Sequence, residues 1–262
     1  MSVLLQVSDP HFGTERAPVV EALVALAGQL RPDLVVLSGD ITQRARPEQF
    51  SAARAMMDRL GAPLLALPGN HDIALFDLWS RVVKPYARYS AAFGTDLAPV
   101  FASADLLVIG VNTTRARRHK DGEVGSEQIA EVARRLAQAA PAQLRVVVVH
   151  QPIDVMRPQD LPDRLHNHRA AQQAWALAGA DIVMGGHIHL PYVMPLPGLA
   201  RPLWAVQAGT AVSSRVRSGV PNSVNVVRWS PQGDCAVEQW DHSHDQAAFV
   251  CAIRTPLQPR RS

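Results

Sequence analysis

The amino-acid sequence predicts an α/β protein built as one domain of two β-sheets with helices on the outside. Apolar strands alternate with amphipathic helices through the first half of the chain, whereas the segment 200–255 contains strands and turns without helices. No linker or internal repeat divides the 262 residues. Strands separated by helices form βαβ units, so the first sheet is expected to be largely parallel. The strands of 200–255 are expected to make a second, antiparallel-leaning sheet.

The elements of the first 190 residues follow a regular order. Pro47 opens a helix and Gly61 is its expected C-terminal stop, as is typical of helix boundaries. The segment 73–93 reads as helical and rich in aromatic residues, and it is expected either to form a lid or to pack on the sheet. The remaining elements are expected to be strands at 2–8, 33–39, 63–67, 106–112, 144–150 and 181–187, and helices at 17–30, 47–60, 126–140 and 168–178.

Composition restricts the classes of function. Hydrophobic residues make up 47% of the chain, and no apolar run reaches the ~18 residues of a membrane span. Cys235 and Cys251 are the only cysteines, which excludes a disulfide framework, and the apolar N-terminus reads as a strand rather than a signal peptide. A cytoplasmic location is therefore expected. The net charge of +3 is compatible with anionic substrates but is too small to indicate a surface that binds nucleic acid.

Polar donors gather where the predicted strands end, which is where open α/β sheets bind their ligands. Asp9 and His11 are two residues apart, as are His187 and His189, so on extended backbone each pair points to one side. Asp, Asn and His are intermediate to hard ligands, which suit divalent Mn, Fe, Zn or Co and do not indicate a thiolate site. The whole set consists of Asp9, His11, Asp40, Asn70, His150, His187 and His189.

Seven donors exceed the needs of one tetrahedral ion. They suit two divalent ions about 3.5–4 Å apart that share one carboxylate. Each short motif taken alone is more often a surface pair, a turn or a satisfied core histidine. A core built for stability alone, however, would not gather seven polar groups, because removing them from water costs free energy. The set therefore predicts a dinuclear metal centre.

The motifs Asp9-x-His11, Gly39-Asp40, Gly69-Asn70-His71-Asp72, His150 and Gly186-His187-x-His189 resemble, in order, those of the calcineurin-like metallophosphoesterases. The resemblance spans residues 1–190. It implies a four-layer αββα sandwich, with two mixed β-sheets flanked by helices, in a single domain over 1–262. It also implies that one metal is held by Asp9, His11 and His189, the other by Asn70, His150 and His187, and that Asp40 bridges them.

The resemblance gives His71 a different task. In this family the residue is not a ligand but faces the substrate, where it stabilises developing charge or donates a proton to the departing oxygen. Asp72 is expected either to fix the tautomer of His71 or to cap a helix.

Departures from the family pattern narrow the subfamily. The stretch "GDITQR" at 39–44 lacks the "GDxVDRG" signature of the Ser/Thr protein phosphatases, and His71 stands where related lipid A precursor hydrolases carry Arg. The length of the chain and the stretch 207–225 are most similar to the bacterial class III cyclic-nucleotide phosphodiesterases. Substrate contacts, with plain structural use as the alternative, are expected from Arg215, Arg217, Asn225 and His119.

The predicted function is metal-dependent hydrolysis of phosphoric esters. A metal-bridging hydroxide is expected to attack phosphorus while His71 assists the leaving group. A phosphodiesterase is favoured, with 3′,5′-cyclic AMP as the leading substrate. The alternatives are a glycerophosphodiester or phospholipid head-group diesterase, a broad phosphatase, or a non-catalytic scaffold organised by metal. The expected partner is a small phosphorylated molecule and not nucleic acid, with a homodimer left open.

Overall fold

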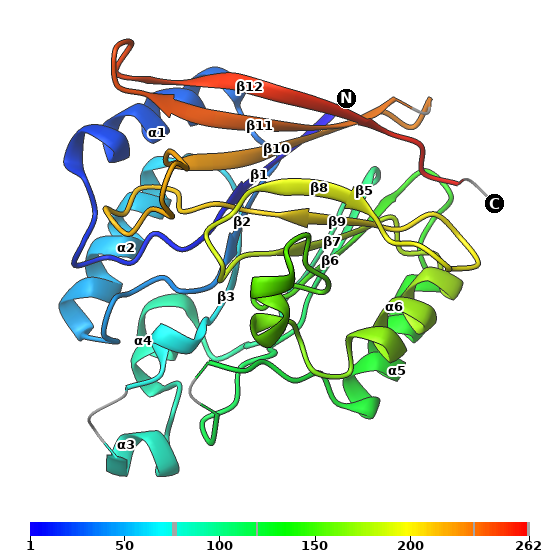
Figure 1. Cartoon of the computed structure of the whole chain (residues 1–262), viewed down its shortest axis with the longest axis horizontal. Coiled ribbons are helices and arrows are strands. Elements are labelled where there is room, and N and C mark those ends of the chain that lie inside the picture. Colours follow the sequence, from blue (N-terminus) through cyan, green and yellow to red (C-terminus); the bar gives the residue numbers. More distant parts are fainter. Residues whose placement is uncertain (75–77, 119, 233, 261–262) are drawn as a thin grey trace.

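Two mixed β-sheets lie face to face, and helices cover their outer sides (Figure 1). The computed structural model of the protein describes residues 1–74, 78–118, 120–232 and 234–260. The four-layer αββα sandwich that the resemblance implies is confirmed. The extension of one domain over the whole of 1–262 stays a prediction.

The first sheet has the strand order β12-β11-β10-β1-β2-β3. Its three N-terminal strands are parallel to one another, and the three C-terminal strands continue it in antiparallel fashion from β1. The strands are β1 (Ser2–Val7), β2 (Leu34–Ser38), β3 (Leu64–Leu67), β10 (Ser223–Trp229), β11 (Cys235–Ser243) and β12 (Ala248–Leu257).

The second sheet has the strand order β4-β5-β6-β7-β9-β8. Its four central strands are parallel, and an antiparallel strand pairs with each side of this group. The strands are β4 (Val100–Ala102), β5 (Leu106–Gly110), β6 (Leu144–Val148), β7 (Ile182–Gly185), β8 (Tyr192–Pro195) and β9 (Trp204–Gln207).

The expectation that 200–255 forms a sheet of its own is wrong. Strand β9 joins the second sheet parallel to β7, and β10 pairs antiparallel with β1, with Leu5 opposite Val226. All five residues of β1 that pair with β10 are buried, as are four of their five partners. Hydropathy shows that a segment is a strand, but its partner is chosen by which buried faces match in three dimensions.

Helices form the two outer layers. The first sheet is covered by α1 (Ala17–Leu30), α2 (Pro47–Arg59) and α4 (Ala87–Phe93), and the second by α5 (Ser126–Leu136) and α6 (His168–Leu177). Apolar side chains fill three spaces: under the helices of each sheet and between the two sheets. The short elements are α3 (Leu78–Val83) and two 3₁₀ turns, η1 (Asn70–Asp72) and η2 (Pro158–Asp163).

The segment 73–93 is expected either to form a lid or to pack on the sheet. The contacts of its aromatic residue Tyr89 agree with packing on the sheet. Tyr89 is fully buried, stacks on Phe93 and donates its hydroxyl to the Ala66 carbonyl of β3 at 2.8 Å. Trp79 is 78% exposed on α3. Residues 75–77 of this segment lie outside the described residues.

Candidate metal centre

The loops that follow β1, β2, β3, β6 and β7 meet at one end of the sandwich and bring together the seven predicted donors. Asp40 lies between the two halves of the set. Its Oδ1 atom is 3.2 Å from Nε2 of His150, and its Oδ2 atom is 3.8 Å from Nε2 of His11. The two oxygens of Asp40 thus face opposite halves of the cluster. The residue is only 2% exposed, so this contact is buried.

The first half of the cluster comes from the loops after β1 and β7. Nε2 of His11 and Nε2 of His189 are 3.0 Å apart, and Oδ1 of Asp9 is 3.4 Å from Nε2 of His189. Asp9 and His11 are fully buried. Three donors from two loops thus converge on one point, as the ligands of a single ion do.

The second half comes from the loops after β3, β6 and β7. Oδ1 of Asn70 is 3.2 Å from Nε2 of His150, and the ring of His187 lies beside that of His150, with centroids 5.2 Å apart. Asp40, His150 and His187 all offer ligand atoms within 4.8 Å of one another. The grouping of donors around two positions agrees with the one that the family resemblance implies.

The ligand-bearing loops are not extended. Asp9, His11, Asp40, His187 and His189 all have φ between 42° and 73°, in the left-handed region. They are five of the nine described non-glycine residues with positive φ. The expectation that each pair points to one side of extended backbone is therefore wrong. Asp and His tolerate this region better than most side chains, and its concentration at one place is typical of functional sites.

Gly69 lets the loops after β2 and β3 touch. A Cβ atom at this position would overlap the backbone nitrogen and the carboxylate of Asp40. The Pro-Gly turn that ends β3 is thus required for close approach and not only for a change of direction. Asn70, the residue that follows Gly69, thus reaches the cluster.

Hydrogen bonds fix two of the imidazoles in the same way. His150 donates Nδ1–H to the Ser38 carbonyl at 2.8 Å, and His189 donates Nδ1–H to the Arg215 carbonyl at 2.7 Å. Each ring therefore turns Nε2 toward the cluster. His187 is held differently, because its Nδ1 atom is buried without a partner among the described residues. A buried nitrogen without a proton donor beside it suits a metal ligand.

Electrostatics support divalent cations at this place. Burial lowers the pKa of His11 to about 3 against the attraction of Asp40 and Asp9, so the ring is neutral at pH 7. Burial raises the pKa of Asp40, but the attraction of His150 and His71 outweighs it and holds this pKa well below its usual value. Burial also lowers the pKa of His150, but Asp40 raises it to about 9. Without metal a proton on His150 balances the carboxylates, and a divalent ion would replace it. The residues present therefore fit two divalent ions.

His71 stands at the edge of the cluster with its tautomer set by the backbone. Its Nδ1–H donates to the Gln43 carbonyl at 3.0 Å, which leaves Nε2 facing Nη1 of Arg215 at 3.4 Å. Asp72 does not fill the tautomer role expected of it. This buried carboxylate accepts hydrogen bonds from the backbone N–H groups of Gly69, Ile41 and Thr42. It ties the loop after β3 to the loop after β2. Because Gly69 is the N-cap residue of η1, its bond to Asp72 also caps the start of this 3₁₀ turn, which agrees with the capping alternative.

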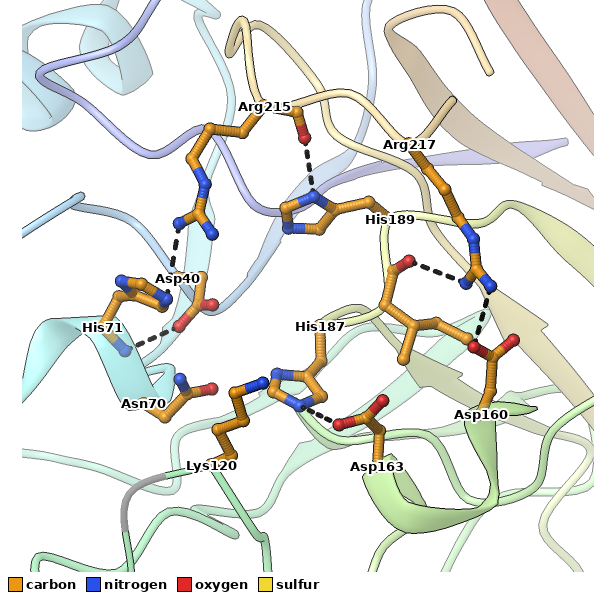
Figure 2. Close-up of a pocket in the computed structure, with 11 residues that line it drawn as sticks. Asp40, Asn70, His71, Lys120, Asp160, Asp163, His187, His189, Arg215 and Arg217 are labelled. Carbon is orange, nitrogen blue, oxygen red and sulfur yellow. Dashed lines mark hydrogen bonds and ion pairs between the residues drawn. The ribbon is translucent and has the colours of Figure 1, made fainter. Parts of the chain in front are cut away.

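A cavity of about 360 Å³ opens beside the cluster (Figure 2). Arg215 reaches into it next to His71 and donates to Oε1 of Gln43 at 2.8 Å. Arg217 donates to Oδ1 of Asp160 at 2.8 Å and to the Ile188 carbonyl at 3.3 Å. The described residues that line the cavity are Asp40, Asn70, His71, Lys120, Asp160, Asp163, His187, Ile188, His189, Arg215 and Arg217.

Three charged lining residues are absent from the expected site. Lys120 belongs to a stretch rich in basic residues, 113–120. Asp160 and Asp163 come from η2, a polar segment whose sequence carries no metal or substrate motif. Only the fold reveals them. None of the described residues of 73–93 lines the cavity.

Comparison with known proteins agrees with this geometry. The family model for the calcineurin-like phosphoesterases matches residues 2–191, which is most of the chain. The chain belongs to this family. Members hold a dinuclear divalent metal centre, and the two ligand sets around Asp40 are where this phosphoesterase would hold its ions.

Three curated relatives are named as phosphodiesterases. A glycerophosphodiester phosphodiesterase of Enterobacter lignolyticus is 37% identical over 81 residues, which cover 27% of this chain and 29% of the relative. A cAMP/cGMP dual specificity phosphodiesterase of Mycobacterium tuberculosis is 27% identical over 71% of this chain and 61% of the relative. A probable cyclic nucleotide phosphodiesterase of Synechococcus is 24% identical over 72% of this chain and 74% of the relative. The chain thus covers less than two thirds of the first two.

Solved structures share the fold at low identity. A purple acid phosphatase from yellow lupin seeds has a TM-score of 0.75 and 12% identity over 98% of this chain and 53% of its own. A dimetal phosphatase from Danio rerio has a TM-score of 0.67 and 13% identity over 99% of both chains. Within the described residues of this phosphoesterase, every helix is too short or too polar to cross a membrane.

Asn225, one of the four expected substrate contacts, lies away from the cavity. Asn225 lies in β10, is 2% exposed, and donates to Oε1 of Gln6 at 2.9 Å and to the Gln207 carbonyl at 3.1 Å. It joins the two sheets inside the core and does not line the cavity, so its expected role in substrate binding is wrong. His119 lies outside the described residues.

Asn225→Ala is expected to affect stability and not substrate binding. The change leaves two buried acceptors without their donor, and this lowers the free energy of unfolding by about 1–3 kcal/mol. Urea unfolding measures the loss, and KM of the folded phosphoesterase should stay at the wild-type value. A raised KM with unchanged stability would contradict the structural role.

Proposed function

We propose that this phosphoesterase hydrolyses phosphodiesters at a dinuclear divalent metal centre formed by Asp9, His11, Asp40, Asn70, His150, His187 and His189. The observation that carries the proposal is the position of Asp40, whose two oxygens face the two donor sets at 3.2 Å and 3.8 Å. When bound, two such ions polarise the phosphate oxygens and supply a water nucleophile at neutral pH.

The residues beside the cluster act on the substrate itself. Nε2 of His71 faces the cavity and lies next to the guanidinium of Arg215, which cannot lose its proton and therefore only donates. Arg215 holds a phosphate oxygen as negative charge develops on it. His71 assists the leaving oxygen from the same side. A metal-organised scaffold without activity would need neither residue.

The charge of the outer cavity favours diesters over monoesters. Beyond the metal donors and His71, the described residues of the lining include three cations (Lys120, Arg215 and Arg217) and two carboxylates (Asp160 and Asp163). The balance is one positive charge. A phosphodiester carries one negative charge, whereas a monoester carries nearly two at pH 7, so this outer lining, counted without the charge of bound metal, complements the diester better.

Two diesters are candidate substrates. The M. tuberculosis relative is named for cAMP and cGMP and the Synechococcus relative for cyclic nucleotides. Both names support 3′,5′-cyclic AMP, which stays our leading prediction from sequence. The cavity favours a second candidate, because Ile188 is the only apolar residue among the described lining residues and none of them is Phe, Tyr or Trp. A purine base gains from apolar or aromatic contact, whereas the glycerol of a glycerophosphodiester needs only polar partners.

A substrate panel tests the proposal. Metal is stripped from the protein and restored with Mn²⁺, Fe²⁺, Zn²⁺ or Co²⁺, and hydrolysis of bis-p-nitrophenyl phosphate is compared with that of p-nitrophenyl phosphate. We expect turnover of the diester to exceed that of the monoester. Cyclic AMP and glycerophosphoethanolamine then separate the two candidates. Two bound ions without hydrolysis of any ester would instead support the scaffold.

The two arginines are expected to respond differently to substitution. Arg215→Ala should lower kcat/KM about tenfold to hundredfold, the contribution of one charge-assisted hydrogen bond to the transition state. Arg217 is already paired with Asp160, and so Arg217→Ala should raise KM with a smaller change in kcat. Steady-state kinetics on the best diester measures both effects. Equal changes in kcat for the two variants would contradict this division.

A further inference from the structure

In the ring of His187, the nitrogen with a polar neighbour is Nε2, whereas in His150 and His189 the nitrogen bonded to the protein backbone is Nδ1. His150 and His189 are fixed through Nδ1 and present Nε2. In His187, Nε2 lies 3.6 Å from Oδ1 of Asp163, whereas Nδ1 is buried without a partner among the described residues (Figure 2). The nitrogen left for a metal is therefore Nδ1, and a carboxylate stands on the far side of the ring.

We propose that Asp163 is a positioning residue for the second metal position. Its carboxylate accepts the Nε2 proton of His187 and so favours the tautomer whose Nδ1 lone pair binds the ion. A carboxylate behind a ligating imidazole also raises its basicity, and loss of such a partner typically weakens metal binding tenfold to hundredfold. This inference rests on the proposed dinuclear centre and assigns a role that neither the motifs nor the matched family imply.

The fold holds the carboxylate in place. The segment 151–167, which contains η2, leaves β6 after His150, and its ends are joined where the N–H of Leu165 donates to the Pro152 carbonyl at 2.9 Å. Arg164, next to Asp163 in the chain, pairs with Asp154 at 3.1 Å. Pro162 restricts the backbone immediately before it. Asp163 is thus delivered to His187 by an anchored segment.

Asp160 provides a matched control. It belongs to the same 3₁₀ turn, lines the same cavity and carries the same charge, but its partner is Arg217 and not a predicted metal ligand. A general effect of negative charge on cation binding would appear in both variants. An effect through the His187 ring would appear in Asp163 variants alone.

The experiment compares Mn²⁺ binding by the wild type, Asp163→Asn and Asp160→Asn. Asparagine keeps the shape of the side chain, but its amide can donate to Nε2 and so favour the tautomer that blocks Nδ1. Calorimetric titration of metal-free protein should show one of the two Mn²⁺ affinities lowered about tenfold to hundredfold in Asp163→Asn, with the other retained. At two equivalents, electron paramagnetic resonance should show isolated ions in place of the coupled pair. Asp160→Asn should match the wild type, and Asp163→Glu should restore part of the lost affinity.

Several outcomes would overturn the role of Asp163. These are wild-type affinity for both ions in Asp163→Asn, an equal loss at both positions, or the same loss in Asp160→Asn. A wild-type protein that binds fewer than two ions overturns the dinuclear centre and this role with it. If Mn²⁺ binding changes as expected but no ester is hydrolysed by the wild type, the proposed function fails and the role of Asp163 stands.

Discussion

Asp40→Ala is expected to abolish dinuclear metal binding and with it turnover. The variant removes the only carboxylate whose oxygens face both donor sets in the described chain, at 3.2 Å from His150 and 3.8 Å from His11. Metal analysis should find at most one ion per chain. Turnover should fall at least about 10³-fold, because the ions supply several kcal/mol of transition-state stabilisation.

The stability of the metal-free variant separates loss of ligand from loss of fold. Asp40 and Asp9 are both buried, and the charge of Asp40 acts to raise the pKa of Asp9. Removal of one buried carboxylate relieves this repulsion, so Asp40→Ala should fold without metal. Thermal unfolding with and without Mn²⁺ tests this, and the wild type but not the variant should gain the full stabilisation from two bound ions. Two ions per chain in Asp40→Ala would refute the bridge.

His71→Ala is expected to lower kcat about 10²- to 10⁴-fold while both ions stay bound, the range typical of a group that transfers a proton in the transition state. His71 is not among the residues around the two metal positions that the resemblance implies, and its Nδ1 is occupied by the Gln43 carbonyl. Metal content and kcat of the variant are measured on the same preparation.

The leaving group distinguishes two ways in which His71 can act. If the ring takes up a second proton from water and gives it from Nε2 to the leaving oxygen, His71→Ala should affect an alkyl diester far more than bis-p-nitrophenyl phosphate, because p-nitrophenolate departs without a proton. If the ring instead holds Arg215 at 3.4 Å, both substrates should lose the same factor. His71→Gln keeps an acceptor for Arg215 and serves as the control. Loss of metal from His71→Ala would contradict both roles.

The sequence alone was sufficient to predict the elements that deliver the donors. Apolar runs that end in Gly, Pro, Asp and His are local signals. The strands that precede Asp9, Asp40 and His150 lie where the hydropathy of the sequence predicts them. The stretch "LPGNHD" at 67–72 likewise predicts the turn that releases Asn70. These features depend on neighbours in the chain, and so they can be read without knowledge of the fold.

The tertiary structure decided what depends on distant partners. Strands β10 to β12 extend the first sheet because β10 pairs with β1, about 220 residues earlier in the chain, and this pairing buries Asn225 between Gln6 and Gln207. The left-handed backbone of the ligand loops is stabilised by contacts between loops, such as that of the His187 N–H with Asp9. Asp163 reaches His187 because two loops meet, and no spacing in the sequence encodes that meeting. Local patterns therefore indicated the candidate donors, and long-range packing determined which side chains lie beside them.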